Sequence, residues 1–269
     1  MTQTDRAAPR QLALVTGASS GIGYDLARQF AAHGFDLVVA AEDAAIEDAT
    51  VTLRAMGGVV EPVQVDLARA DGVDHLYARV QATGRSPDAV AINAGIAVNG
   101  PFAETDLAEE VRLIELNVTS SVRLAKRALQ DMVPRGAGRI LITSSIAAEG
   151  PGPYTAIYSA SKAFLLSFAE AIRYELRDTG VTVTALQPGA TDTAIFARAG
   201  MEDTKLGASP KISAAEVAKA GFEALMAGKD HVVAASVKER VQVAVGPLVP
   251  ATVKAAAQGA LTKPGSADS

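Results

Sequence analysis

The most informative absence in this 269-residue chain is that of cysteine. Without thiols, disulfide bridges and thiolate metal sites are excluded, and we expect no metal site. The absence also agrees with a reducing cytoplasm, which is where we expect the protein to reside. An excess of positive charge is missing too, because the net charge is −5, and we therefore expect no nucleic-acid partner.

Long apolar runs are missing as well. The low-charge stretch 241–253 is broken by Gly246, Pro247 and Pro250, and it is too short to span a bilayer. The N-terminal residues MTQTDRAAPRQ are polar and lack the apolar segment of a secretory signal. We therefore expect no transmembrane segment, and a flexible arm over residues 1–10.

What the chain does contain is a repeated alternation of apolar runs and helical patterns. The apolar runs predict strands over residues 12–16, 37–41, 59–65, 89–93, 139–144, 181–186 and 231–235. The intervening patterns predict helices over residues 21–33, 44–56, 72–83, 107–133, 155–178 and 214–227. Such an order predicts one α/β domain over residues 11–236, a Rossmann-like, doubly wound parallel sheet with helices on both faces. The extension over residues 237–269 has no defined pattern.

The first predicted strand runs directly into a glycine-rich turn, TGASSGIG. Gly17, Gly21 and Gly23 would let the backbone approach a pyrophosphate, whose charge the following helix N-terminus stabilises. The spacing differs from the commoner G-x-G-x-x-G, and a plain βα turn would look similar. Residues 17–21 also match the G-x-S-x-G elbow of α/β-hydrolases. That elbow normally follows later strands and needs a downstream histidine, for which only His231 is available.

A second motif, IYSASKA, opens the helix predicted over residues 155–178. Tyr158 and Lys162 are four residues apart and therefore share one helix face. A nearby ammonium group favours the phenolate form and lowers a tyrosine pKa, ordinarily about 10, so the pair suits proton transfer. SASK also matches the S-x-x-K of β-lactamases, but their companion motifs S-D-N and K-T-G are absent from the sequence.

Polar residues stand where predicted strands end. Ser144 and Ser145 close one strand and Asn93 closes another, at the sheet edge where open α/β folds bind ligands. A serine hydroxyl there can donate to a substrate carbonyl oxygen. Asn117 lies inside a helical pattern that it disfavours, so it either serves a site or is a tolerated surface residue.

Taken in order, these motifs resemble the short-chain dehydrogenase/reductase family. The matching segments are TGASSGIG, VDL at 65–67, NAG at 93–95, Asn117, SS at 144–145, YSASK at 158–162 and PGATDT at 188–193. The resemblance spans residues 12–231. It implies an NAD(P)-dependent oxidoreductase that interconverts a secondary alcohol and a ketone or aldehyde by hydride transfer. Alternatives are a non-catalytic nucleotide-sensing or scaffold protein, and dehydratase or epimerase chemistry on the same fold.

The resemblance also implies roles for single residues. Tyr158 would exchange the proton, Lys162 would lower its pKa and hold the nicotinamide ribose, and Ser145 would polarise the carbonyl group. Asn117 would hold a water molecule that connects Lys162 to solvent. The implied cofactor-binding residues, which run from the pyrophosphate turn through the adenine and groove positions to the nicotinamide carboxamide, are Gly17, Ser19, Ser20, Gly21, Ile22, Gly23, Glu42, Asp66, Leu67, Asn93, Ala94, Gly95, Tyr158, Lys162, Pro188, Gly189, Thr191 and Thr193.

The second predicted strand ends at two acids, Glu42 and Asp43. Glu42 stands where relatives that prefer NADP(H) carry arginine, and Ser20 fills another position that is often basic in them. A 2′-phosphate beside Glu42 would be repelled, so we predict NAD(H) over NADP(H), with Glu42 accepting from the ribose. Asp43 is interpreted as the start of the next helix, whose positive end suits an acid.

The remaining predictions concern substrate and assembly. Ile195, Phe196 and Met201 lie in the segment 190–210, where the family varies with substrate. They indicate a small carbonyl or alcohol substrate that is partly apolar, unless they only fasten the loop. The resemblance further implies a homodimer or homotetramer formed through the long helices.

Overall fold

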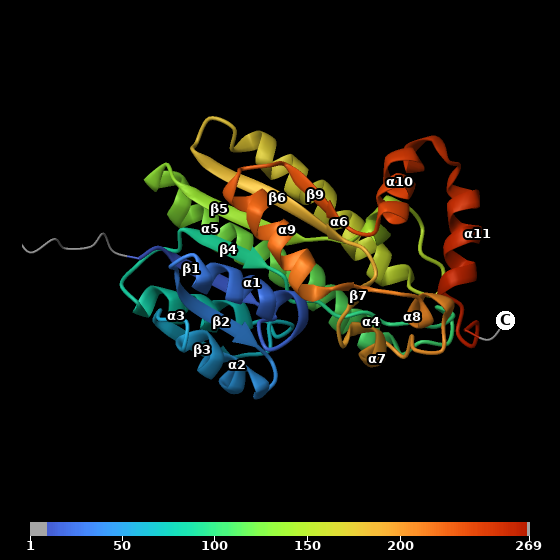
Figure 1. Cartoon of the computed structure of the whole chain (residues 1–269), viewed down its shortest axis with the longest axis horizontal. Coiled ribbons are helices and arrows are strands. Elements are labelled where there is room, and N and C mark those ends of the chain that lie inside the picture. The colour runs from blue at the N-terminus through green and yellow to red at the C-terminus, as the bar shows by residue number, and fades with distance from the viewer. Residues whose placement is uncertain (1–9, 268–269) are drawn as a thin grey trace, which may run out of the picture.

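The computed structural model describes residues 10–267, which form an open sheet covered by helices on both faces (Figure 1). All strands of the main sheet run parallel, in the order β3-β2-β1-β4-β5-β6-β9. They are β1 (Leu12–Thr16), β2 (Asp36–Ala41), β3 (Val60–Gln64), β4 (Ala89–Ile92), β5 (Gly138–Thr143), β6 (Val181–Pro188) and β9 (His231–Ala234). This is the strand order of dinucleotide-binding folds, and the predicted doubly wound α/β fold is confirmed.

The two faces of the sheet bury separate apolar cores because strand side chains alternate. In β1, Leu12 and Leu14 enter one core, whereas Ala13 and Val15 enter the other. The helices over the first core are α3 (Gly72–Ala82), α5 (Ser120–Arg135) and α6 (Ala156–Glu175). Those over the second core are α1 (Gly21–Ala32), α2 (Ala45–Arg54) and α9 (Ala214–Met226). With both faces covered, the carboxyl edge of the sheet is left for a ligand.

The helix predicted over residues 107–133 is present, but its middle departs from α-helical geometry. The continuous helix expected over residues 107–133 is divided into α4 (Leu107–Ile114), the π-helical turn η1 (Glu115–Thr119) and α5. A π-turn inserts an extra residue into the helix and re-aims the side chains around it, frequently at functional sites. The asparagine that sequence reasoning marked as unfavourable, Asn117, lies at the centre of this turn.

Helical structure also continues beyond residue 236, in the extension for which no element was predicted. The extension contains α10 (Val237–Val245), the 3-10 turn η3 (Gly246–Leu248) and α11 (Ala251–Thr262). In Figure 1 these helices stand next to each other at one end of the molecule. The shorter elements before them are η2 (Ile146–Glu149), β7 (Thr191–Asp192), α7 (Ile195–Arg198), α8 (Lys205–Ala208) and β8 (Ile212–Ser213). Over residues 10–267 no helix has the length and apolar character that crossing a bilayer requires.

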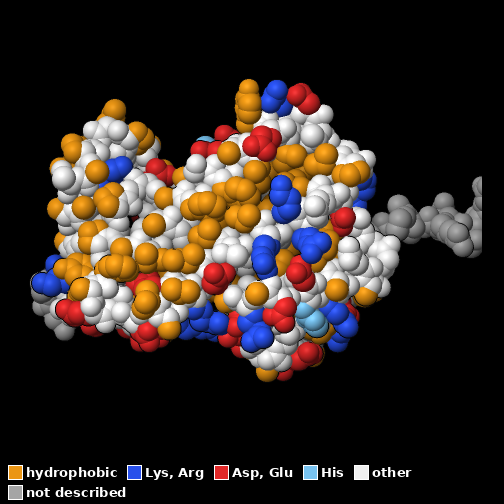
Figure 2. Space-filling view, turned by 180° about the vertical axis from the view of Figure 1, so that it is seen from behind, with side chains coloured by type: hydrophobic (Ala, Val, Ile, Leu, Met, Phe, Trp, Pro, Cys, Tyr) orange, Lys and Arg blue, Asp and Glu red, His pale blue; other side chains and the backbone are white. Residues whose placement is uncertain are grey.

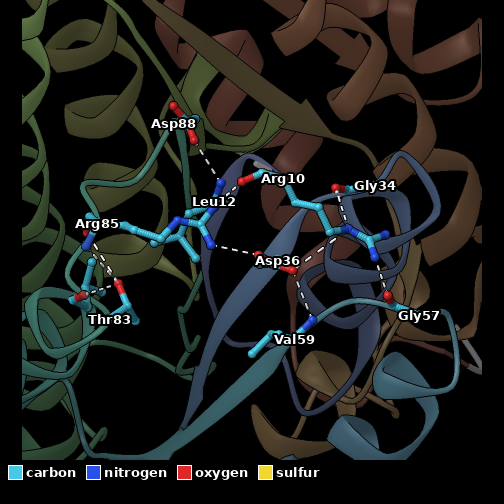
Figure 3. A network of polar contacts seen from close by, with 10 residues as sticks. Arg10, Leu12, Gly34, Asp36, Gly57, Val59, Thr83, Arg85 and Asp88 are labelled. Atoms are coloured by element: carbon cyan, nitrogen blue, oxygen red, sulfur yellow. Dashed lines mark hydrogen bonds and ion pairs between the residues drawn. The ribbon is translucent and has the colours of Figure 1, made fainter. Parts of the chain in front are cut away.

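The amino edge of the sheet is closed by a polar network, shown in Figure 3. The buried carboxylate of Asp36 accepts from Arg85 Nη1 (2.7 Å) and from the Val59 amide (3.0 Å), and Arg10 lies 3.9 Å away. Burial opposes this charge, but the bonds from Arg85 and Val59 keep the pKa of Asp36 below its usual 3.8. The network joins Asp36 at the start of β2 to the segments that precede β1, β3 and β4. The remainder of the predicted arm, residues 1–9, lies outside the described residues.

Candidate active site

A cavity of about 770 Å³ opens at the carboxyl edge of the sheet. Almost every residue named from the sequence lines it, from the glycine turn to Tyr158 and Thr193. Gly23 and Asn117 are the exceptions, since both are buried behind the wall. The volume lies within the range of ligand pockets, and the lining joins the predicted cofactor and catalytic residues in one space.

The glycine turn between β1 and α1 depends on its glycines. Gly17 has φ +67°, and a Cβ there would lie 3.0 Å from the Ala94 backbone. At Gly23 a Cβ would lie 2.1 Å from the Gly17 carbonyl oxygen. Only glycine therefore permits α1 to begin so close to the end of β1, with its free N–H groups facing the cavity side of the turn. The cradle fits the pyrophosphate of a dinucleotide.

Asn93 fixes the floor of the cavity, where three strands end. Its side-chain amide donates to the Thr16 carbonyl (3.2 Å), and its own carbonyl accepts from Thr143 Oγ1 (3.2 Å). Thr16 Oγ1 in turn accepts from the amides of Asn93 (2.9 Å) and Ala94 (3.1 Å). Asn93 thus ties β1, β4 and β5 together, so the residues that follow these strands keep a fixed spacing.

Tyr158, Lys162 and Ser145 meet above that floor. Lys162 is 4% exposed, and its Nζ donates to the Thr143 carbonyl (3.0 Å) and lies 5.7 Å from the centre of the Tyr158 ring. Ser144 Oγ donates to the Lys162 carbonyl (2.6 Å), which anchors α6 to the end of β5. Ser145 Oγ accepts from the Ala147 amide (3.1 Å). One residue pair at the end of β5 therefore positions the helix that carries the tyrosine and the lysine.

Burial changes the proton affinity of both groups. It lowers the pKa of Lys162 to about 8, and no carboxylate within residues 10–267 pairs with this ammonium. It raises the pKa of Tyr158, an effect that the hydrogen bond with Ser145 opposes. Lys162 is not among the groups that shift the pKa of Tyr158 in this structure, so the predicted lowering of that pKa by Lys162 stays a prediction. Burial thus shifts both groups toward their uncharged forms, and Lys162, with a pKa of about 8, still carries its proton at pH 7.

Asn117 forms hydrogen bonds with the loop that follows β4. Its Oδ1 accepts from the Ile96 amide (3.0 Å), while its Nδ2 donates to the Ile96 carbonyl (3.0 Å) and to Ser161 Oγ (3.1 Å). A Cβ on Gly95 would lie 3.1 Å from Asn117 Oδ1 and 3.4 Å from Lys162 Nζ. The π-turn therefore brings Asn117 beside both Lys162 and the loop, and the predicted water-holding role stays a prediction.

Where the cavity is lined by residues that follow β2 and β3, the carboxylates of Glu42 and Asp66 both pair with Arg112, a residue that no sequence motif indicated. Arg112 of α4 donates Nη2 to Glu42 (2.7 Å) and Nη1 to Asp66 (2.8 Å). Burial opposes the Asp66 charge, but the bond from Arg112 keeps the pKa of Asp66 below its usual value. Glu42 keeps a largely exposed side chain, and the three groups together carry one net negative charge.

Asp43 has a different role from the predicted one. Helix α2 begins at Ala45, with Ala44 as its N-cap residue, so Asp43 lies outside the helix. Its side chain instead accepts from Ser19 Oγ of the glycine turn (3.2 Å) and lies 3.6 Å from Arg198. Asp43 therefore connects the turn to the segment after β7, which its position in the sequence alone could not indicate.

Comparison with known proteins identifies the family. A family model for short chain dehydrogenases matches residues 11–203. The chain belongs to this family. The resemblance inferred from the motifs is thereby confirmed, and the short chain dehydrogenase fold accounts for the observed strand order. The cavity at the carboxyl edge corresponds to the place where such a fold binds a dinucleotide.

Individual short chain dehydrogenases resemble the chain over most of its length. The probable oxidoreductase EphD of Mycobacterium tuberculosis is 36% identical over 191 residues, 70% of this chain. That match covers 32% of EphD, so the chain spans about a third of the length of this relative.

Two solved structures share the fold. A short-chain dehydrogenase from Sphingobium yanoikuyae in complex with NADPH has a TM-score of 0.79 at 31% identity, covering 88% of this chain and 93% of that one. A short chain dehydrogenase/reductase from Burkholderia phymatum in complex with NAD has a TM-score of 0.78 at 26% identity, covering 89% and 92%. Such structures bind either nicotinamide cofactor, so the comparison does not choose between them.

Proposed function

We propose that this short chain dehydrogenase interconverts a secondary alcohol and a ketone or aldehyde with a nicotinamide cofactor. The observation that carries the proposal is that Tyr158, Lys162 and Ser145 line the same cavity as the glycine turn. When bound, the nicotinamide supplies or accepts the hydride. The protein residues hold the reactants, exclude water and move the proton.

Each residue has a part that follows from its contacts. The Tyr158 hydroxyl, kept protonated by burial, donates to the oxygen of a carbonyl substrate as reduction proceeds. Ser145 Oγ, held by the Ala147 amide, hydrogen-bonds the same oxygen and stabilises its developing charge. Lys162 is fixed by the Thr143 carbonyl, where it can hold a ribose hydroxyl and supply protons toward Tyr158. In oxidation the same groups act in reverse, and Tyr158 accepts the proton.

We propose that NAD(H) is preferred over NADP(H). The support is the negative charge in the part of the cavity where the adenosine of the cofactor is expected to bind. There, two carboxylates, Glu42 and Asp66, pair with one guanidinium group, that of Arg112. A dianionic 2′-phosphate would have to displace Glu42 from Arg112 or lie beside its carboxylate. With Arg112 engaged, Glu42 still has an exposed oxygen that can accept from a ribose hydroxyl.

The experiment is a fluorescence titration of the protein with NADH and with NADPH, followed by a panel of ketones and alcohols with the preferred cofactor. We expect tighter binding of NADH, and consumption of NADH matched by alcohol formed. Tighter binding of NADPH would contradict the cofactor preference. Nucleotide binding without turnover across the panel would contradict the activity.

We also propose a homo-oligomer. Leu107, Val111 and Ile114 follow helical spacing on α4 and are 72%, 47% and 39% exposed, and Phe164 on neighbouring α6 is 42% exposed. An apolar stripe of this kind is typical of a helix that packs against another subunit. Sedimentation equilibrium measures the subunit number directly, and a monomer at micromolar concentration would contradict the proposal.

A further inference from the structure

The catalytic cavity does not end at Tyr158 but continues along the C-terminal helices. The residues of α10, η3 and α11 that line it are Lys238, Glu239, Gln242, Val243, Val245, Gly246, Val253, Lys254, Ala257, Gln258, Leu261 and Thr262. In Figure 1 this pair of helices stands beside the sheet, and Figure 2 shows hydrophobic side chains gathered on the same lobe. The lobe is thus part of the cavity wall.

The wall has an apolar stripe. Val253, Ala257 and Leu261 are spaced by four residues, so they share the face of α11 that borders the cavity. Although they line a cavity, Val253 is 55% exposed and Leu261 is 38% exposed. Residues that line a cavity and keep accessible apolar surface favour an apolar ligand.

Further apolar residues line the same cavity. The segment between β7 and β8 contributes Ile195, Phe196, Met201 and Leu206, and the turn after β5 contributes Ile146 and Ala147. The sequence left open whether Phe196 and Met201 contact substrate or only fasten the loop. Met201 is 6% exposed and belongs to the packed interior, whereas Phe196 keeps accessible surface beside the cavity.

Several charged groups of the wall are already engaged by the fold. Glu239 Oε1 accepts from the Ala190 amide (2.9 Å), and its Oε2 accepts from the Ser236 amide (2.8 Å) in a capping box. Lys254 Nζ donates to the Glu149 carbonyl (2.6 Å). These side chains fasten the helices and leave the apolar stripe to contact the ligand.

The far end of α11 is fastened too. Thr262 Oγ1 donates to the Pro153 carbonyl (2.7 Å), and Asn99 Nδ2 donates to the Thr262 carbonyl (2.9 Å). Beyond the helix, the Gly265 amide donates to Asp203 Oδ2 (2.8 Å). Contacts at both ends hold α11 against the loop that precedes Tyr158, so the stripe is a fixed wall of the site.

We propose that this short chain dehydrogenase takes a substrate whose reacting carbon bears an extended apolar chain, which lies along the stripe of Val253, Ala257 and Leu261. The inference rests on the proposed function, because the apolar chain of the substrate is positioned by the reacting carbonyl carbon at Tyr158. Val253 and Leu261 are eight positions apart on α11, a length of about 12 Å, which an extended chain of roughly eight to ten carbons would follow.

The test is a series of 2-alkanones from 2-butanone to 2-decanone, with NADH as reductant. Each methylene buried against the stripe should raise kcat/KM about threefold until the wall is filled. Calorimetric titration of the NAD⁺-saturated protein, which has no hydride to transfer to a ketone, gives dissociation constants for the same ketones that do not depend on turnover. A flat series in both readouts would overturn the inference while leaving any 2-butanone turnover, and with it the proposed function, in place.

A matched pair of variants locates the effect. Leu261→Ser should lower the 2-decanone to 2-butanone ratio of kcat/KM, and of affinity, about tenfold. Leu248→Ser removes the same type of side chain from the turn η3 between the two helices, at a position 87% exposed and outside the cavity lining, and should leave the ratio unchanged. Equal effects of the two variants would overturn the inference. So would dissociation of an oligomer by Leu261→Ser without a change in the ratio, because a second subunit would then cover the stripe.

Discussion

The two edges of the sheet differ in how their buried charged groups are paired. At the amino edge, the buried carboxylate of Asp36 is neutralised by Arg85 and Arg10 within the fold (Figure 3). At the carboxyl edge, Lys162 is buried with a carbonyl oxygen as its partner, and no carboxylate in the described part of the chain offsets its charge. The fold completes the amino edge, whereas the carboxyl edge is left for a ligand to complete.

The pKa shifts of Asp36, Lys162 and Tyr158 follow this difference, whereas Asp66 at the carboxyl edge is paired with Arg112 and has a lowered pKa like that of Asp36. Arg85 and the Val59 amide keep the pKa of Asp36 low against the cost of burial, so its charged form stabilises the fold. Burial lowers the pKa of Lys162 to about 8 and raises that of Tyr158, so the fold disfavours the charged forms of both. Groups with such shifts beside a cavity are typical of catalytic sites, where stability is exchanged for reactivity.

The largest effect should come from removing the reactive hydroxyl at the carboxyl edge. Tyr158→Phe should lower kcat about a thousandfold, because proton transfer to the developing alkoxide is lost. NADH should still bind, and the melting temperature should not fall. Tyr174→Phe, on the same helix but 69% exposed, is the control and should be fully active. Comparable turnover of the two variants would show that Tyr158 does not transfer the proton.

At the amino edge the effect should fall on stability instead. Asp36→Ala should lower the free energy of unfolding by about 2 kcal/mol, since Arg85 and the Val59 amide lose their acceptor. Because the pKa of Asp36 is lowered, this contribution is present above its usual value of 3.8 and is lost as the pH falls through the folded value. Urea unfolding at several pH values measures it.

The control for the amino edge is Asp178→Ala, which removes a carboxylate that is 84% exposed. Its effect should stay within about 0.5 kcal/mol. If Asp36→Ala lowered kcat per folded molecule without lowering the free energy of unfolding, Asp36 would serve catalysis rather than stability. The proposed difference between the two edges would then be wrong.

A third change tests whether the charge of Glu42 determines the preference for NAD(H) over NADP(H). Glu42→Ala frees Arg112 from one of its two carboxylates, so a 2′-phosphate can pair with it. We expect the NADPH to NADH affinity ratio to rise about tenfold, or ~1.4 kcal/mol, and to shrink again at high salt. Glu61→Ala, which removes an acid paired with Arg79 outside the cavity, should not move the ratio. An unchanged ratio in Glu42→Ala would refute the preference argument.

The smallest effect concerns the pH dependence of stability at the carboxyl edge. Lys162 has a folded pKa of about 8, below its ordinary 10.5, so between these values the unfolded chain binds the extra proton. Wild-type stability should therefore rise with pH relative to Lys162→Met, on the order of 1 kcal/mol between about pH 7.5 and about pH 9.5. A difference that falls over this range would contradict the burial of an unpaired ammonium.

Local patterns in the sequence predicted the parts of the molecule that depend on neighbouring residues. Strand periodicity gave the sheet, and the spacing of Tyr158 and Lys162 placed both on one helix. Arg112 was missed because it reaches Asp66 from 46 residues away in the chain, a pairing that no local pattern contains. The π-turn at Asn117 was foreseen only as a disfavoured residue, since its form depends on contacts with Ile96 and Ser161.

The C-terminal helices were missed for another reason. The stripe of Val253, Ala257 and Leu261 has the spacing of any apolar helix face, and periodicity cannot tell a face that covers a core from one that borders a cavity. The capping box of Ser236 and Glu239 is the local signal that could have marked the start of α10. Its second use, the bond from Glu239 to the Ala190 amide, appears only in the folded chain.

The central claim is that the amino edge stabilises the fold while the carboxyl edge carries the catalysis. The most direct test measures the loss of NADH absorbance and the alcohol formed for wild type, Tyr158→Phe and Asp36→Ala. All three proteins should bind NADH. Wild type and folded Asp36→Ala should then oxidise it at equal rates with a ketone, while Tyr158→Phe should not. NADH binding by all three proteins with no turnover by wild type on any carbonyl compound would contradict the account and favour a nucleotide-binding protein without catalysis.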